Sequence, residues 1–233
     1  MQPDGHLPSY TTRGCKKFPV PQAFLRARLF LDSRRLSAYT ACMPKTGRKP
    51  TPPRSSRRAV VLGLGISLDG YIARPDGTVD FLFMPKDYSM APFFKTIDAA
   101  ILGRKTYDVV KKMGGGGFGS FKLEYYVMSR TLPPGERDGL IFTSESPAAL
   151  VARLRKKKGK NIWLMGGGEL ARAFLIDNLV DDLYLGIVPV LLGSGLPLFP
   201  PGFPQRNFVL TENKTFSRGL ISLKYQRIRS SRK

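Results

Sequence analysis

The chain has 233 residues, of which 42% are hydrophobic, and its formal net charge at pH 7 is +21. This length and composition fit one globular domain of ordinary size plus an appendage. No apolar run is long enough to cross a membrane. The first residues also lack the apolar core of a secretory signal, so we expect neither a membrane-spanning nor a secreted protein.

Half of the excess charge lies in residues 1–58. They hold 13 Lys and Arg against two acidic residues, whereas residues 59–233 hold 25 against 15. Arg-rich, Ser-containing, acid-poor composition is typical of organelle transit peptides, but the prolines at 50–53 are typical of a linker. We interpret residues 1–58 as a disordered basic tail outside the chemistry. A targeting segment, or upstream sequence ahead of a start at Met43, is the alternative.

The positions of cysteine and histidine exclude several kinds of catalytic site. Cys15, Cys42 and His6 all lie in the tail, so residues 59–233 contain neither residue type. This excludes a Ser-His-Asp triad, a cysteine nucleophile and the zinc site of a nucleotide deaminase, and we expect no metal. Two cysteines indicate a reducing compartment, and we expect a cytoplasmic protein. An enzyme of this composition would depend on carboxylates, backbone amides, cations or a bound organic cofactor.

The first predicted strand covers residues 59–66 and is apolar on both faces, which is typical of a central parallel strand. It leads into Ser67–Ala73, where Asp69 and the following glycine indicate a turn. Because α/β proteins place ligand contacts at the carboxyl ends of buried strands, Asp69 is also a candidate ligand contact.

A second strand end carries cations and a hydroxyl group. Residues 90–98 are predicted to form a short helix and residues 99–102 a buried strand. Gly103–Thr106 then opens a helix with Arg104 and Lys105 in its first turn. Cations oppose the helix dipole at that position unless an anion is bound. The pattern suits a phosphate site, and a solvated first turn without a ligand is the alternative.

A third predicted strand, residues 124–128, ends in Ser129 and Arg130. The ends of neighbouring parallel strands lie side by side. A third strand end with polar and cationic residues therefore supports a shared ligand site at that edge of the sheet. The glycine-rich run 114–119 is interpreted as a flexible loop, and residues 140–143 as a further strand.

The helix predicted over residues 147–158 ends in a basic run, Arg155–Lys160. Cations suit a helix C-terminus, and we prefer this interpretation to a nucleic-acid contact, for which a short basic run is weak support.

The most informative stretch is an apolar run, Ile162–Met165, that breaks at Gly166–Gly168 and resumes as a helix from Glu169 to Ile176. Glycines allow a ligand to approach the backbone closely, and free N–H groups at a helix start favour an anion such as phosphate. A tight strand-to-helix turn without a ligand is the alternative.

The remaining elements complete the prediction of the fold. Residues 182–190 are predicted to form a strand and residues 192–199 a loop. Residues 208–216 and 220–229 are predicted to form an antiparallel hairpin. Strands that alternate with helices and end in a hairpin indicate an α/β fold with a mostly parallel central sheet, flanking helices and a C-terminal antiparallel pair.

The motifs, taken together, resemble the dihydrofolate reductase-like superfamily, most closely the branch of the reductase domain of riboflavin deaminase-reductases. The resemblance covers about residues 59–229 and rests on five motifs in order: Ser67–Ala73, Gly103–Thr106, Ser129-Arg130, Gly166–Leu170 and Val188–Gly195.

The resemblance implies an NADPH-dependent reductase. It implies that Gly103–Thr106 holds cofactor phosphates and that Ser129-Arg130 holds the 2′-phosphate. The glycine run would lie against the pyrophosphate and nicotinamide. The cofactor-binding residues expected on this basis are Gly103, Arg104, Lys105, Thr106, Ser129, Arg130, Gly166, Gly167, Gly168 and Glu169. Asp69 is the candidate catalytic residue, as a substrate contact.

The substrate implied by the resemblance is a pyrimidine or pteridine heterocycle, most closely the ribosylaminopyrimidine of riboflavin biosynthesis. Dihydrofolate reductase activity is an alternative, although residues 88–97, which match the helix that carries its substrate-binding acid, contain no acid. A further alternative is a non-catalytic nucleotide- or nucleic-acid-binding protein that uses the tail and Arg155–Lys160. We expect a small-molecule partner, no membrane, no nucleic acid and, by resemblance, a homodimer.

Overall fold

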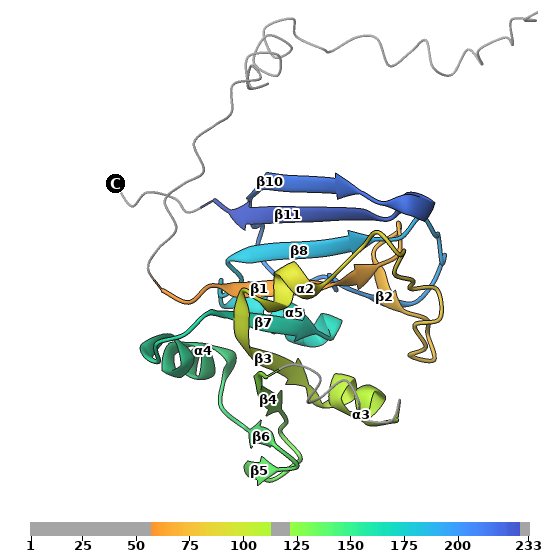
Figure 1. Cartoon of the computed structure of the whole chain (residues 1–233). Helices are drawn as coiled ribbons and strands as arrows, with labels where there is room; N and C mark the ends of the chain where they lie inside the picture. The colour runs from red at the N-terminus through yellow and green to blue at the C-terminus, as the bar shows by residue number, and fades with distance from the viewer. Residues whose placement is uncertain (1–56, 113–121, 229–233) are drawn as a thin grey trace, which may run out of the picture. The chain divides into compact units, whose positions relative to one another are not determined.

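The structure, a computed structural model, describes residues 57–112 and 122–228. The predictions for residues 1–56 and for the glycine-rich loop at 114–119 lie outside the described residues. The domain is built on a nine-stranded sheet in the order β10-β11-β8-β1-β7-β3-β4-β6-β5, beside a two-stranded sheet of β2 and β9 (Figure 1). The strands are β1 (Val60–Ile66), β2 (Tyr71–Ala73), β3 (Ile97–Gly103), β4 (Glu124–Met128), β5 (Gly135–Arg137), β6 (Leu140–Thr143), β7 (Asn161–Gly166), β8 (Asp182–Ile187), β9 (Leu196–Pro197), β10 (Phe208–Thr215) and β11 (Ile221–Arg227). The helices are α2 (Ala91–Phe94), α3 (Arg104–Lys112), α4 (Pro147–Lys156) and α5 (Gly168–Ile176).

The predicted fold class is confirmed. Strands β8, β1, β7, β3, β4 and β6 are parallel, and β10 and β11 form the antiparallel pair at one end of the sheet. We call the edge at which the parallel strands begin the amino edge, and the edge at which they end the carboxyl edge. Two further antiparallel pairs, β5 with β6 and β2 with β9, were not predicted.

Helices cover both faces of the sheet. On one face, Leu62 and Leu164 pack with Leu150 and Leu154 of α4 and Phe174 of α5 in the main core. On the other face, smaller clusters form around Phe93 of α2 and Tyr107 of α3. Because both faces are covered, the central strands are apolar at nearly every position, as parallel strands are.

Most of the predicted elements differ from the structure by one or two residues at their ends, and two of them end three or more residues earlier than predicted. The helix predicted over residues 90–98 ends at Phe94, because Ile97 and Asp98 belong to β3 and Ile97 pairs with Asn161 of β7. The strand predicted over residues 182–190 ends at Ile187, and Pro189, which has no N–H to donate to a ladder, follows shortly after.

The boundary between tail and domain lies before Arg58. The sequence assigns Arg58 to the tail, but its side chain is buried and forms an ion pair with Asp98 of β3. Its guanidinium also donates hydrogen bonds to the carbonyl oxygens of Lys160 at 2.7 Å and Leu154 at 3.1 Å. Arg58 therefore joins the domain at its amino edge.

The described helices are short. α4, with ten residues, is the longest of them. A helical membrane span needs about 20 apolar residues, so none of the helices within residues 57–112 and 122–228 qualifies as one.

Candidate active site at the carboxyl edge

Strand pairing brings the predicted site segments together. β3 lies between β4 and β7, with Gly103 paired to Met128 and Leu102 paired to Gly166. The three segments that follow these strands therefore leave the sheet side by side at the carboxyl edge. This placement is what a cofactor site in an open α/β sheet requires.

The glycine turn is a close contact between two of the predicted segments. Gly166 and Gly167 have φ values of 101° and 89°, a region that favours glycine. The Thr106 hydroxyl lies 3.4 Å from the carbonyl oxygen of Gly166. A Cβ atom on Gly167 would lie 3.1 Å from the same hydroxyl oxygen. Thr106 and the glycine run thus form one surface without intervening side chains.

Gly168 packs against a loop that the sequence left without structure. A Cβ atom there would lie only 2.2 Å from the carbonyl oxygen of Pro197. Pro197 belongs to β9, which pairs with β2, and Leu198 N–H donates to the carbonyl oxygen of Gly70 at 3.0 Å. The β2–β9 pair therefore brings the fifth motif, Val188–Gly195, and the first motif to the same edge.

Arg104 links the second and third predicted segments. Its Nε donates to the Asp108 carboxylate at 2.9 Å, and its Nη1 donates to the Thr131 hydroxyl at 3.0 Å. Sequence reasoning missed both partners. Asp108 is four residues after Arg104, a spacing that places two side chains on one helix face, so that signal was present.

The third segment forms a turn around Ser129. This buried hydroxyl accepts hydrogen bonds from the N–H groups of Thr131 at 3.2 Å and Leu132 at 2.9 Å. Arg130 and Lys105 project from their turns into solvent. The carboxyl edge thus presents Arg104, Lys105 and Arg130, a set of cations suited to phosphate groups.

Asp69 braces two loops. Its carboxylate accepts hydrogen bonds from the Ser67 hydroxyl at 2.6 Å and from the N–H groups of Leu192 at 3.0 Å and Gly193 at 2.8 Å. The Ser67 hydroxyl is the main cause that holds the pKa of Asp69 below its ordinary value, and the two N–H groups add to it. Asp69 is therefore ionised at neutral pH, and in this structure it positions the loop after β8.

Glu169 lies in the first turn of α5, where a carboxylate suits the helix dipole. It is exposed and forms an ion pair with Arg172 at 2.7 Å. Trp163, which sequence reasoning did not assign to the site, donates from Nε1 to the carbonyl oxygen of Gly63 at 2.7 Å and contacts Phe93 edge-on. The hydrogen bond from Trp163 joins β7 to β1.

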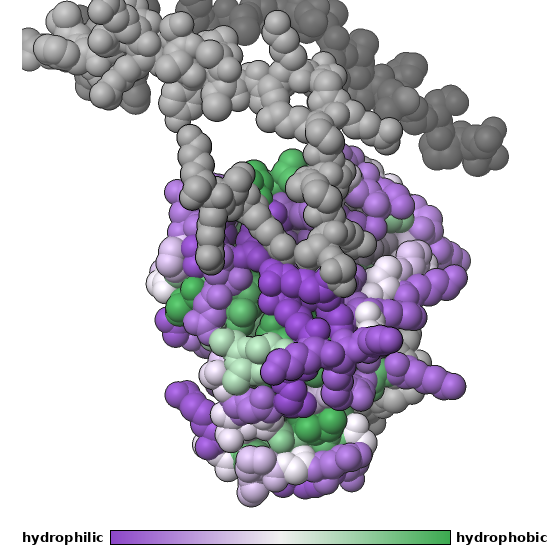
Figure 2. All heavy atoms as spheres, turned by 90° about the vertical axis from the view of Figure 1, so that its left-hand side faces the viewer, coloured by the Kyte–Doolittle hydropathy of each residue, from purple (hydrophilic) through white to green (hydrophobic). Residues whose placement is uncertain are grey.

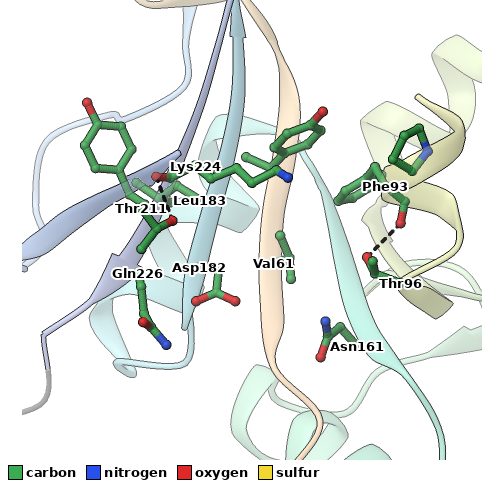
Figure 3. A pocket seen from close by; sticks show the side chains of 12 residues that line it. Val61, Phe93, Thr96, Asn161, Asp182, Leu183, Thr211, Lys224 and Gln226 are labelled. Carbon is green, nitrogen blue, oxygen red and sulfur yellow. Dashed lines mark hydrogen bonds between the residues drawn. The ribbon is translucent and has the colours of Figure 1, made fainter. Parts of the chain in front are cut away.

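A hollow of about 340 Å³ lies away from these residues (Figure 3). Its walls include Val61, Phe93, Asn161, Asp182, Lys224 and Gln226, and none of the predicted site residues line it. Val61 and Asn161 are at the starts of β1 and β7, so the hollow is on the amino side of the sheet. Phe93 of the four-residue α2 forms part of its wall.

The model of the RibD C-terminal domain family matches residues 58–222. Among curated proteins, the uncharacterized protein YwjB of Bacillus subtilis (strain 168) is 35% identical over 173 residues, 73% of this chain and 98% of YwjB.

Solved structures with the same fold have lower identity. A diaminohydroxyphosphoribosylaminopyrimidine deaminase/5-amino-6-(5-phosphoribosylamino)uracil reductase from Thermotoga maritima is 16% identical with a TM-score of 0.56, over 74% of this chain and 57% of that protein. Dihydrofolate reductase from Enterococcus faecalis, complexed with NADP(H) and RAB-propyl, is 17% identical with a TM-score of 0.54, over 73% and 98%. The fold is therefore dihydrofolate reductase-like.

Proposed function

The chain belongs to the RibD C-terminal domain family, and we propose that it is an NADPH-dependent reductase. Its carboxyl edge would hold the cofactor, and the acceptor would be a pyrimidine or pteridine heterocycle. The observation that carries the proposal is the meeting of Thr106, the glycine run and the Arg104–Thr131 bridge at one edge of the sheet.

The residues of this edge fit a dinucleotide. The absence of side chains at Gly167 and Gly168 lets the glycine run pack closely against Thr106 and the carbonyl oxygen of Pro197, which fixes the start of α5 beside the end of β3. The first N–H groups of α5 have no partner within the helix and suit an anion. Arg104, Lys105 and Arg130 supply positive charge for phosphates. A bound phosphate would also offset the repulsion between Arg104 and Lys105 and the positive end of the α3 helix dipole.

The bound nicotinamide would supply the hydride, and this chain's residues would bind and orient the cofactor and the heterocyclic acceptor. Arg104 is already fixed by Asp108 and Thr131, so little side-chain freedom is lost when it meets a phosphate. Asp69 would keep the loops after β1 and β8 in register beside the nicotinamide. Catalysis would rest mainly on holding donor and acceptor in a productive geometry.

The first substrate to test is 5-amino-6-(5-phosphoribosylamino)uracil, which the name of the Thermotoga maritima protein gives for its reductase activity. This chain spans 57% of that protein, and residues 59–233 lack the His and Cys that a zinc deaminase needs. The proposal therefore concerns the reductase step and no deamination by residues 59–233. Dihydrofolate is the second substrate to test.

The cofactor assignment is tested by titrating the full chain with NADPH and with NADH and following Trp163 and nicotinamide fluorescence. Arg104→Ala and Arg130→Ala are compared with Arg153→Ala, a control that removes an exposed arginine of α4. A lost charged hydrogen bond should weaken NADPH binding by about 10- to 100-fold. NADH has no 2′-phosphate, so replacing the arginine that holds this phosphate should weaken NADPH binding and leave NADH binding unchanged. Equal losses for both cofactors would reject that role, and no binding of either by folded protein would reject the reductase.

A further inference from the structure

The basic run at the end of α4 divides into two groups. Arg155 turns inward and pairs with Asp181, and Lys157 pairs with Glu124 at 3.2 Å. These two residues have the structural role that the sequence assigns to the whole run. Lys156, Lys158 and Lys160 are exposed and have no ion pair among the residues that the structure describes.

Neighbouring carboxylates are already engaged by other cations. Asp98 pairs with Arg58, and Glu124 pairs with Lys157. Asp181 pairs with three arginines, Arg57, Arg155 and Arg227. The three exposed lysines therefore add positive charge to this part of the amino edge, and none of them forms an ion pair with a carboxylate of the described residues. In Figure 2, which views the domain from the side where β1 starts, hydrophilic residues cover most of the visible surface.

The backbone that carries these lysines is held in place. Arg58 donates to the carbonyl oxygens of Leu154 and Lys160, and Lys160 N–H donates to the Asp98 carboxylate at 2.8 Å. Gly159 allows this close approach, since a Cβ atom there would lie 2.3 Å from an Asp98 oxygen. A fixed backbone lowers the conformational cost of presenting several cations to one partner.

We propose that this part of the amino edge, formed by Lys156, Lys158 and Lys160, binds the phosphate backbone of nucleic acid. Arrays of lysine bind phosphates without reading sequence and release counterions as they do so. The segment 156–160 carries no apolar side chain, so it lacks the anchor that membrane-surface binding adds. The proposal reverses the interpretation of the whole run as a helix terminus, and it is independent of the reductase.

The surface is distinct from the candidate active site. Parallel strands separate the amino edge from the carboxyl edge, where the glycine run and Arg104 lie. A bound polyanion would therefore leave the cofactor edge open. Arg57 and Arg58, which pair with Asp181 and Asp98, also lie at this edge.

The test compares two double variants of the full chain, so that the basic tail contributes equally to both. One is Lys156→Gln with Lys158→Gln. The control is Lys86→Gln with Lys214→Gln, which removes the same charge from exposed positions outside the amino edge. The probe is a labelled DNA duplex of about 20 base pairs, titrated between about 50 and 200 mM salt. Thermal unfolding checks that both variants remain folded.

The proposal predicts that the Lys156/Lys158 variant binds DNA more than about tenfold more weakly at low salt. The slope of log K against log salt should become shallower by about 2, because two phosphate contacts are lost. The Lys86/Lys214 control should change the DNA affinity and the salt slope less than the Lys156/Lys158 variant does. Equal losses in the two variants, or no loss in the first, would overturn the proposal and assign DNA binding to net charge or to the tail. Lysine-dependent binding to phosphatidylserine vesicles without binding to DNA would overturn it as well.

Discussion

The two edges of the parallel sheet are built from different chemistry. The amino edge is held by buried charge, with the Asp181 carboxylate between Arg57, Arg155 and Arg227. The carboxyl edge is formed by glycines, backbone amides and a carboxylate, Asp69, that braces loops. The amino edge therefore fixes the fold, while the carboxyl edge brings the predicted cofactor-binding segments together. Substitutions at the two edges should therefore fail in different ways.

Among the substitutions at the two edges, we expect Asp181→Asn to cause the greatest loss, and that loss is in stability. Asp181 is 4% exposed, and its carboxylate also accepts a hydrogen bond from Val60 N–H at 3.0 Å. Removing its charge leaves three guanidinium groups without their shared anion, and a broken buried pair costs about 3–5 kcal/mol. Urea unfolding should report a loss of this order. Asp177→Asn, at the exposed end of α5, is the control and should change stability by less than about 0.5 kcal/mol.

The same carboxylate predicts how stability depends on pH. Burial by itself raises the pKa of Asp181, but the Val60 N–H and the surrounding arginines outweigh it and hold the pKa below the ordinary value. A lowered pKa in the folded state stabilises the protein above the unfolded value of about 3.9 and loses this effect as the pH falls below it. Stability should therefore fall steeply in acid, and Asp181→Asn should flatten that fall. An unchanged acid profile in the variant would contradict this account.

At the carboxyl edge, we expect Gly168→Ala to weaken cofactor binding. Gly168→Ala would place a Cβ 2.2 Å from the carbonyl oxygen of Pro197, so either α5 or the β9 loop must shift. Overpacking of this kind costs about 1–3 kcal/mol, and the shift should displace the glycine run. We expect NADPH affinity to fall by more than about tenfold while the protein still unfolds cooperatively. Normal affinity in the variant would show that the β9 loop does not shape the site.

The smallest effect is expected from Asp69→Asn. An amide retains one acceptor oxygen, so some of the bonds from Ser67, Leu192 and Gly193 should survive. NADPH affinity should fall by about 2- to 10-fold, the range for a lost neutral hydrogen bond. Because the pKa of Asp69 is lowered, it should contribute no ionisation between about pH 5 and 8. A pH-dependent step in that range, lost in the variant, would instead assign Asp69 a proton-transfer role.

The order of strands and helices could be predicted from the sequence because apolar runs and breaks are local signals. The end of α2 could not, since Ile97 joins β3 through pairing with Asn161, more than sixty residues later. Arg58 was assigned to the tail for the same reason: its burial depends on Asp98 and Lys160, which composition does not reveal.

The candidate site was predictable where residues follow strands directly. Gly103, Arg130 and Gly166 come after apolar runs, and the parallel sheet brings those ends together. The contact of Gly168 with Pro197 was not predictable, because β9 has two residues and no pattern of its own. Nor did the sequence divide the basic run into inward and outward cations, since that depends on where Asp181 lies.

The most direct test of the difference between the edges is a map of NADPH-induced amide shift changes in the isotope-labelled full chain. We expect the largest changes at Gly103, Gly167 and Gly168, and none at Lys156–Lys160. Changes centred on the amino edge, or in the hollow beside Val61 and Asp182, would contradict the account. The absence of any change at saturating NADPH would contradict it equally.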